Sequence, residues 1–456
     1  MTSDKAKIRQ LATGVAGLDR VLGGGLPEFS FNLLAGAPGS GKTTLAHQIM
    51  FALATPERPA LYFTVLGEPP LKMLRYQQQF EFFTSDKVNR SIRFISLEED
   101  MFGGDLGKVL GRITSEVAEL QPALVFIDSF RSIALAGSDR GNGFLSLQQF
   151  IQQLGMLMTS WQATTFLVGE YISDHEPSPI VTVADGLIWL RQSVQRSSVV
   201  RKMEIVKMRG QATLPGLHTF RINSAGIHVF SPFLSSRTAT RAAVPGGPRL
   251  RLGVPGLDEM MGGGLPQGYS LLVAGPSGSG KSILASRFLL EGARGGETGI
   301  IAAFEQHPEK SCGPEIAALV ESGRIAVLDM QLLTLSVDEV ATQLMEEIRR
   351  LKATRVVIDS LSGFELALAP AFREDFRESL ALMMSALASI GVTVLMTSEL
   401  EDRYTELSFS PYGTAFLTDA IIIQRYVEID GRLERILAVV KVRASAHSNE
   451  LRLYHI

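Results

Sequence analysis

The chain has 456 residues, of which 45% are hydrophobic and 20% charged, enough apolar material for two ordinary globular cores. Its formal net charge of −3 and pI near 6.2 argue against a general polyanion binder, although a local basic patch is compatible with that average. The single cysteine, Cys312, excludes an intramolecular disulfide and is typical of a reducing cytoplasm.

The chain opens with MTSDKAKIRQ, which lacks the apolar core of a secretory signal, so we expect a cytoplasmic protein. Apolar runs then alternate with helix-forming segments, which is typical of a parallel sheet covered by helices on both faces. After residue 185 strand follows strand, which predicts an antiparallel extension of the sheet. The expected strands are 31–35, 60–66, 92–97, 124–128, 164–169, 186–192, 201–209 and 217–223, and the expected helices are 43–54, 69–82, 105–120 and 144–160.

A glycine-rich loop, GAPGSGKT at Gly36–Thr43, lies between the first predicted strand and helix, and GPSGSGKS at Gly275–Ser282 has the same context. Such loops cradle nucleotide phosphates with backbone N–H groups, while the lysine reaches the outer phosphates and the last hydroxyl ligates Mg²⁺. Two matches in the same context predict nucleotide binding. The expected nucleotide-binding residues are Gly36, Pro38, Gly39, Ser40, Gly41, Lys42, Thr43, Thr44, Gly275, Ser277, Gly278, Ser279, Gly280, Lys281 and Ser282.

The two loops belong to a duplication of the whole pattern. The lead-in sequences GLD and GGGLP precede both loops at the same spacing, and later features recur with only slightly smaller offsets. We therefore expect two copies of one α/β domain, at residues 1–231 and 250–456. The segment between them, 232–249, is rich in Ser, Thr, Pro and Gly and is expected to be a linker.

One uncharged stretch, Ser379–Ser398, is long enough to span a bilayer. Its first part is rich in Leu, Met and Ala, Gly391 interrupts it, and the following VTVLM is strand-like. We interpret it as a helix, a turn and a buried strand, and expect no membrane association.

Two apolar strands end in a carboxylate, at Asp128 and Asp359. In a phosphate-loop ATPase, a carboxylate at this position holds Mg²⁺ through its water shell. A strand that ends in aspartate is common by itself, but the matched loops favour the metal role. The expected magnesium ligands are Thr43, Asp128, Ser282 and Asp359.

Hydrolysis also needs a carboxylate that orients the attacking water. The second copy offers Glu305, at the end of a predicted strand in FEQHP. In a gap-free alignment on the following proline, the first copy has Leu66 in that position and Glu68 opposite His307. The first copy has therefore either lost the carboxylate or uses Glu68 through a one-residue shift, and a solvated loop glutamate is an equal alternative for Glu68.

The late strands carry equally spaced cations, Lys207 and Arg209 in the first copy and Lys441 and Arg443 in the second. Two-residue alternation places each pair on one strand face. In a ring-shaped ATPase such cations stabilise phosphate charge in a neighbour's site, as an arginine finger does. The alternative is a solvated edge strand whose charges discourage aggregation.

These features together resemble the KaiC family, the circadian-clock branch of the RecA-like ATPases. The likeness covers nearly the whole chain and is most specific at Val356–Ser379, VVIDSLSGFELALAPAFREDFRES. It implies two tandem RecA-like phosphate-loop domains in a double-ring homohexamer, with ATP between neighbouring subunits. It also implies that the basic strands act in trans, through Arg201, Lys207 and Arg209 in the first ring and Arg435, Lys441 and Arg443 in the second.

Three departures modify what the resemblance implies. Family domains show paired glutamates before the x-Pro step, whereas the second copy keeps one, Glu305, and the first copy keeps neither, so we expect weaker hydrolysis in the first ring. Ala415 and Phe416 replace the phosphorylated Ser-Thr pair of the family and accept no phosphate. The tail gripped by the clock activator is missing after Ile456, which argues against a KaiA-type activator.

We therefore expect an ATPase that uses ATP and Mg²⁺ as a slow nucleotide-state switch and signals to a protein partner, such as a KaiB-like protein or a kinase. One alternative is a Ser/Thr autokinase that uses other hydroxyls, for which Thr414 and Thr418 are weak substitutes. Further alternatives are a DNA-stimulated motor of the recombinase or helicase kind, and a scaffold in which ATP is structural. Nucleic acid is not an expected partner, because the sequence offers no obvious DNA loop or aromatic stacking platform.

Overall fold

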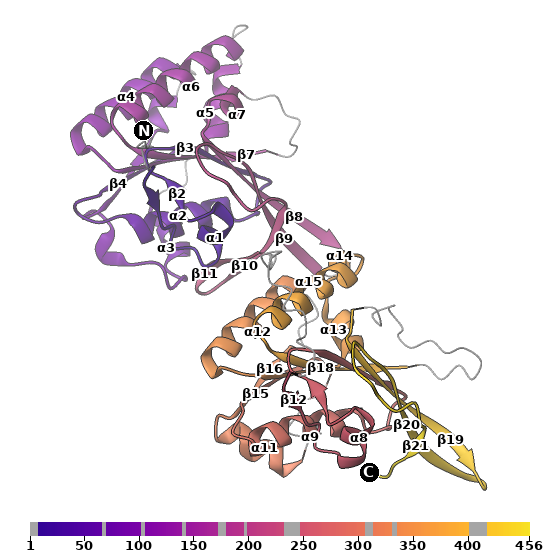
Figure 1. The fold of residues 1–456 in the computed structure, drawn as a ribbon. Helices are drawn as coiled ribbons and strands as arrows, with labels where there is room; N and C mark the ends of the chain where they lie inside the picture. Colours follow the sequence, from indigo (N-terminus) through magenta and orange to yellow (C-terminus); the bar gives the residue numbers. More distant parts are fainter. Residues whose placement is uncertain are drawn as a thin grey trace, which may run out of the picture. The chain divides into compact units, whose positions relative to one another are not determined.

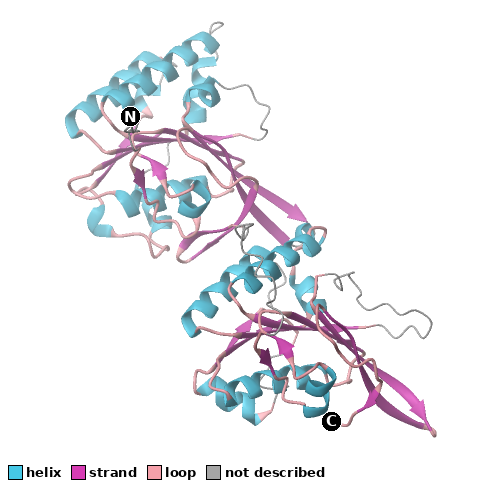
Figure 2. Cartoon of the chain, in the orientation of Figure 1, coloured by secondary structure: helices cyan, strands magenta, loops and turns pink. Residues whose placement is uncertain are grey.

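The computed structural model describes residues 8–65, 70–101, 105–138, 143–171, 179–195, 198–231, 247–305, 313–330, 335–400 and 417–456. The chain divides into two compact units, of which the first comprises Met1–Val194 and Val199–Ser231 and the second comprises Gln195–Ser198 and Pro232–Ile456. Each unit holds one large sheet between two layers of helices (Figure 1; Figure 2). The expected linker, 232–249, falls mostly outside the described residues, and its last residue, Arg249, begins a short strand, β12 (Arg249–Leu250).

The sheet of the first unit is built around β3 (Phe31–Gly36), the strand that leads into the glycine-rich loop. Its strand order is β11-β10-β9-β8-β3-β7-β6-β4-β5. β3 runs parallel to β7 and β8, whereas β10 pairs antiparallel with both β9 and β11. The other strands are β4 (Ala60–Thr64), β5 (Ile92–Ser96), β6 (Leu124–Asp128), β7 (Thr164–Glu170), β8 (Gly186–Gln195), β9 (Ser198–Met208), β10 (Leu217–Asn223) and β11 (Gly226–Phe230), besides the short pair β1 (Gln10–Leu11) and β2 (Leu26–Pro27).

Helices cover both faces of this sheet, so side chains on each strand alternate between two cores. Leu34 packs in the core beneath α1, α2 and α3, and its neighbour Leu33 packs in the core beneath α4, α5, α6 and α7 (Figure 1). The helices are α1 (Leu18–Leu22), α2 (Lys42–Leu53), α3 (Pro70–Gln77), α4 (Leu106–Leu120), α5 (Phe130–Ser138), α6 (Gly143–Ser160) and α7 (Pro179–Val183), with 3₁₀ turns η1 (Ser85–Lys87) and η2 (Glu99–Met101).

The second unit repeats this topology around β14 (Ser270–Gly275), in the strand order β16-β15-β17-β18-β14-β19-β20-β21. Its other strands are β13 (Leu265–Pro266), β15 (Gly299–Ala303), β16 (Ile325–Asp329), β17 (Arg355–Asp359), β18 (Thr393–Glu399), β19 (Ala420–Ile429), β20 (Arg432–Val442) and β21 (Arg452–Leu453). Its helices are α8 (Pro255–Met260), α9 (Lys281–Arg294) and α11 (Pro314–Glu321) on one face, and α12 (Val337–Leu351), α13 (Leu361–Ala367), α14 (Pro370–Arg373) and α15 (Phe376–Ser389) on the other (Figure 1).

The predicted fold class is confirmed: two tandem RecA-like α/β domains, each with a mostly parallel sheet and a C-terminal antiparallel extension. The uncharged stretch Ser379–Ser398 comprises most of α15, a turn at Gly391 with φ of 80°, and nearly all of the buried strand β18, as predicted. Among the described residues, no helix is long and apolar enough to cross a membrane.

Candidate functional site

Each glycine-rich loop connects the central strand of its sheet to a helix, β3 to α2 and β14 to α9. The residue before each helix is a glycine with left-handed φ, 103° at Gly41 and 94° at Gly280, a conformation that other residues resist. The first N–H groups of a helix have no intrahelical partner, so each loop ends at a ready anion-binding site. The predicted nucleotide-binding residues therefore occupy the turn and the first helical residues of each unit.

Both loop lysines fold back over their own loop. Nζ of Lys42 donates to the carbonyl of Ala37 over 2.9 Å, and Nζ of Lys281 donates to the carbonyl of Pro276 over 2.8 Å. Burial lowers the pKa of both ammonium groups, and nearby carboxylates oppose this shift, with Glu170 the first of them at Lys42. Each ammonium thus lies at its loop, where the oxygens of a bound phosphate would take the place of these carbonyls as hydrogen-bond acceptors.

The expected magnesium ligands come together in each unit. In the first, Thr43 Oγ1 donates to Asp128 Oδ2 over 2.8 Å. In the second, Ser282 and Asp359 line one cavity of about 310 Å³ together with Lys281. Hydroxyl and carboxylate oxygens are the donors that Mg²⁺ prefers, so both sets fit the ion.

Glu305 lines the same cavity of the second unit as the loop lysine and the aspartate. The Ser360 hydroxyl donates to Glu305 Oε1 and accepts the amide N–H of Gly363, at 3.1 Å. Gly363 provides the necessary room, because a Cβ there would lie 2.6 Å from Glu305 Cγ. The predicted water-orienting carboxylate is therefore held at the edge of the nucleotide cavity.

The first unit is built differently at this point. Ser129 stands in the position of Ser360, and Ser132 in the position of Gly363; their hydroxyls are hydrogen-bonded at 3.2 Å. Since Ser132 carries the Cβ that Gly363 lacks, a glutamate in the pose of Glu305 would clash there. The aligned Leu66 and the candidate Glu68 lie outside the described residues.

Two carboxylates that the sequence analysis did not select lie beside the loops. Glu170 ends β7 in register with Gly36, and Glu399 ends β18 in register with Gly275. Glu399 lines the second unit's cavity. A parallel sheet places ligands at the carboxyl ends of its strands, so the strand ends next to the loop strand were the signal that would have found both residues.

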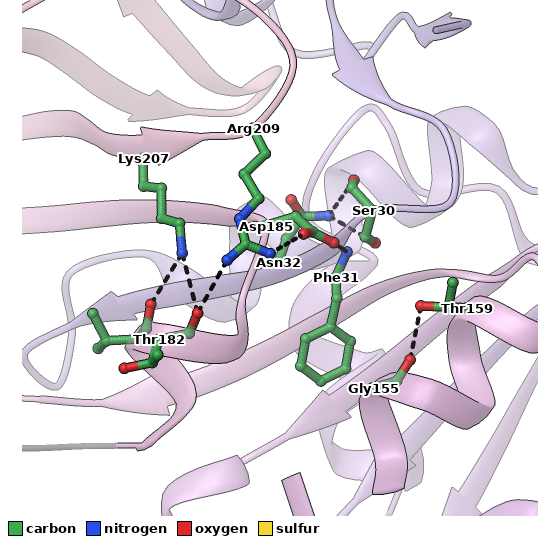
Figure 3. A network of polar contacts seen from close by, with 10 residues as sticks. Ser30, Phe31, Asn32, Gly155, Thr159, Thr182, Asp185, Lys207 and Arg209 are labelled. Atoms are coloured by element: carbon green, nitrogen blue, oxygen red, sulfur yellow. Dashed lines mark hydrogen bonds and ion pairs between the residues drawn. The ribbon is translucent and has the colours of Figure 1, made fainter. Parts of the chain in front are cut away.

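In the first unit, Lys207 and Arg209 point towards Thr182 of α7, and Arg209 also meets Asp185, as Figure 3 shows. Arg209 Nη1 donates to Asp185 Oδ1 over 3.0 Å, and its Nη2 donates to the carbonyl of Thr182 over 3.3 Å. Nζ of Lys207 donates to the same carbonyl over 3.3 Å. The side chain of Arg209 is still 57% exposed, so its head is presented at the surface.

The second unit repeats this arrangement. Arg443 Nη1 donates to Asp419 Oδ1 over 3.1 Å, and Nζ of Lys441 donates to the carbonyl of Thr418 over 2.6 Å. The two units thus hold their cation pairs in matching poses, against the residues that directly precede β8 and β19.

The candidate fingers Arg201 and Arg435 lie on β9 and β20. The guanidinium of Arg435 stacks over Tyr426, 5.6 Å from the ring centre, and the Tyr426 hydroxyl donates to the carbonyl of Ser277 over 3.4 Å. Arg435 therefore lies near the loop of its own unit. Among the described residues, Nε of both arginines is buried without a hydrogen-bond partner.

Apolar side chains of the sheet extensions also reach the loops. A Cβ on Gly41 would lie 2.8 Å from Ile222 Cδ1, and a Cβ on Gly280 would lie 2.6 Å from Ile456 Cδ1. Tyr454 donates its hydroxyl to the carbonyl of Ser279. No sequence motif predicts these contacts, because the residues lie far from the loops along the chain.

The model of one protein family, described as "ATPase: KaiC", matches residues 11–233 and again residues 250–456. The chain belongs to the KaiC ATPase family. Its relatives include proteins named circadian clock oscillator protein KaiC: that of Rippkaea orientalis is 27% identical over 98% of this chain and 87% of the relative, and that of Picosynechococcus sp. is 27% identical over 98% and 88%. That of Prochlorococcus marinus strain MIT 9313 is 25% identical over 99% of this chain and 92% of the relative.

Membership of the KaiC family makes this chain a nucleotide-binding ATPase, which confirms the predicted family and enzyme class. The match covers both units, so both glycine-rich loops belong to family ATPase domains. The roles of individual side chains stay predictions.

Proposed function

We propose that this protein is a KaiC-type ATPase that hydrolyses ATP with Mg²⁺ mainly at the site of its second unit. The observation that carries this proposal is the placement of Glu305, fixed by Ser360 in the cavity that Lys281 and Asp359 also line. The first unit has Ser132 in the position of Gly363, so we expect less room for such a carboxylate there.

At the second site, Lys281 binds the outer phosphates, and Ser282 and Asp359 hold Mg²⁺, which neutralises phosphate charge when bound. Glu305 orients a water molecule and accepts its proton as the water oxygen attacks the γ-phosphorus. The bond to the β–γ bridging oxygen breaks, giving ADP and inorganic phosphate. Ser360 keeps the carboxylate of Glu305 aligned between turnovers.

At the first site, Lys42, Thr43 and Asp128 bind the magnesium nucleotide in the same way, but turnover is slower. Bound ATP there serves mainly to hold subunits together. We propose a double-ring homohexamer in which cations of one subunit reach the nucleotide of the next. These cations are Arg201, Lys207 and Arg209 in the first ring and Arg435, Lys441 and Arg443 in the second.

The relatives are named as clock oscillator proteins, and we propose that this protein likewise acts as a slow nucleotide-state switch. Its partner is a signalling protein, such as a KaiB-like protein or a kinase. The autokinase alternative has little support: Ala415, Phe416 and Thr414 lie outside the described residues, and Thr418 is 1% exposed, so it is closed to phosphorylation in this conformation.

Disabling one loop at a time tests the proposal. Lys281→Ala should abolish most phosphate release, whereas Lys42→Ala should keep most of it and weaken the hexamer measured by light scattering in ATP. Radiolabel from the γ-phosphate, counted on protein in the same reactions, should stay at background. Loss of phosphate release in Lys42→Ala alone would overturn the assignment of the second site, and label on protein would restore the autokinase.

A further inference from the structure

A tyrosine hydroxyl lies behind the metal-facing carboxylate of the first unit. Tyr62, on β4, donates its hydroxyl proton to Asp128 Oδ2 over 2.7 Å. The same oxygen accepts the hydroxyl of Thr43, the other magnesium candidate, at 2.8 Å. Both of these described hydrogen bonds therefore end on Oδ2, which leaves Oδ1 for the water shell of a metal ion.

The ring of Tyr62 is fixed by its neighbours. Tyr62 is 0% exposed, and His47 packs against it edge-on, with ring centres 4.6 Å apart. The rings of Phe94 and Phe126 also pack against Tyr62, with their centres 5.4 Å and 6.0 Å from the centre of its ring. A buried hydroxyl needs a hydrogen-bond partner. In this aromatic environment, the carboxylate of Asp128 is the partner of the Tyr62 hydroxyl.

The ionisation states of this cluster agree with its geometry. Burial raises the pKa of Tyr62 well above its ordinary value, so the phenol keeps the proton that it donates. Burial lowers the pKa of His47 to about 4, so its ring packs against Tyr62 as a neutral imidazole. Burial also raises the pKa of Asp128, and the hydrogen bonds from Tyr62 and Thr43 oppose this shift.

The second unit braces its aspartate from another strand. Ile301 stands in the position of Tyr62, and Ser286 in the position of His47. Asp359 instead accepts the hydroxyl of Thr397, on β18, and does so on Oδ1. In the first unit the position of Thr397 is taken by Val168, which has no hydroxyl. Each site therefore has its own donor to the metal-facing carboxylate.

We propose that Tyr62 is a positioning residue of the first nucleotide site, which locks Asp128 in the rotamer that holds the magnesium water shell. This inference rests on the proposed nucleotide role of the first unit and deepens it. Hydrogen bonds to charged groups are among the stronger ones in proteins. Because the hydroxyl of Tyr62 acts through the carboxylate that holds the metal, it strengthens nucleotide binding only when Mg²⁺ is present.

The test uses Tyr62→Phe in the full chain with Lys281→Ala, so that binding is read at the first site alone. The probe is a fluorescent ADP analogue, titrated once with Mg²⁺ and once with EDTA. Loss of the hydroxyl should raise the Kd about tenfold with Mg²⁺ and leave it unchanged in EDTA. Tyr76→Phe, at a tyrosine that is 60% exposed, is the matched control and should change neither value.

A rescue variant separates positioning from packing. Val168→Thr places a hydroxyl where the second unit has Thr397, so the pair Tyr62→Phe/Val168→Thr should recover most of the magnesium-dependent affinity. Equal weakening with and without Mg²⁺ would show a merely structural role and overturn the inference, and so would an unchanged Kd.

Folding is checked separately, by thermal melting without nucleotide. Tyr62→Phe keeps the ring, so its melting temperature should match that of the parent. If it does not, the nucleotide affinity of the rescue pair is compared with that of the parent instead. Failure of the rescue pair to recover this affinity counts against the inference. Phosphate release by the second site is not read in this assay, so a failure of this inference can be told apart from a failure of the proposed hydrolysis at the second site.

Discussion

The hydroxyl of Ser360 donates to the carboxylate of Glu305 and ties it to the first turn of α13. The same hydroxyl caps the helix by accepting the amide of Gly363. One side chain, directly after the metal-facing Asp359, therefore both caps α13 and orients the proposed water-binding carboxylate. We therefore predict that the alignment of Glu305 depends on Ser360, which lines the same cavity.

Ser360→Ala should slow phosphate release about tenfold, because a misaligned general base loses part of its contribution. Nucleotide affinity should stay near that of the wild type, since Lys281 and Ser282 are unchanged. Loss of the helix cap should also lower the stability of the unit by about 1 kcal/mol. Ser129→Ala, at the equivalent position of the first unit, is the control and should leave most of the release intact; equal losses in both variants would count against the role of Ser360.

Gly363→Ser introduces the residue that the first unit has at this position. A Cβ at 363 would lie 2.6 Å from Glu305 Cγ, so the carboxylate must leave its place. Phosphate release should fall by about one to two orders of magnitude while nucleotide still binds. The reciprocal change, Ser132→Gly, should have no comparable effect on release. Full activity in Gly363→Ser would show that the pose of Glu305 is irrelevant to hydrolysis.

The buried imidazole of His47 makes the first unit sensitive to acid. The pKa of His47 lies at about 4, below its ordinary value of 6.5, mainly because of burial. Between these values the unfolded chain binds a proton that the folded chain refuses, so the free energy of unfolding falls as the pH drops from 6.5 towards 4. The shift of the His47 pKa corresponds to about 3 kcal/mol of unfolding free energy. This stabilisation is fully present above pH 6.5 and is lost as the pH falls towards 4.

Both tryptophans, Trp161 and Trp189, belong to the first unit, so their fluorescence reports its unfolding. Urea titrations at pH 7 and pH 5 should show a smaller loss of stability for His47→Leu than for the wild type, because the variant has no such group to protonate. An equal loss in both proteins would assign the acid sensitivity elsewhere.

The exposed arginines give a prediction about subunits. If Arg443 reaches the neighbour's second-unit nucleotide, Arg443→Ala should reduce phosphate release by on the order of 10³-fold, as loss of an arginine finger does. Arg209→Ala, its first-unit counterpart, should weaken assembly and spare most of the release. Mixing Arg443→Ala with Lys281→Ala subunits should restore part of the activity, since each supplies what the other lacks; no recovery would contradict a trans role.

The sequence predicted the sheet strands closely, because buried parallel strands are continuous apolar runs such as Leu124–Asp128. It missed α5, which follows that strand directly, and β11, whose five residues offer little periodicity. Predicted helix 69–82 ends earlier, at Gln77. Short elements beside longer ones carry too few residues for their pattern to stand out.

The loops and their aspartates were predicted because their chemistry is written in short motifs. The role of the Tyr62 hydroxyl was not, since only the folded sheet shows that this core side chain reaches Asp128. The same holds for Gly363, whose meaning depends on the approach of Glu305 from another strand. Contacts between distant segments, unlike motifs, need the fold before they can be read.

The most direct test measures phosphate release and nucleotide binding on the same samples of wild type, Glu305→Gln and Glu68→Gln. Release by Glu305→Gln should fall by at least about 100-fold with nucleotide still bound, and Glu68→Gln should behave as the wild type. If Glu305→Gln keeps its activity, or if Glu68→Gln is the damaging change, the second unit is not the main site of hydrolysis.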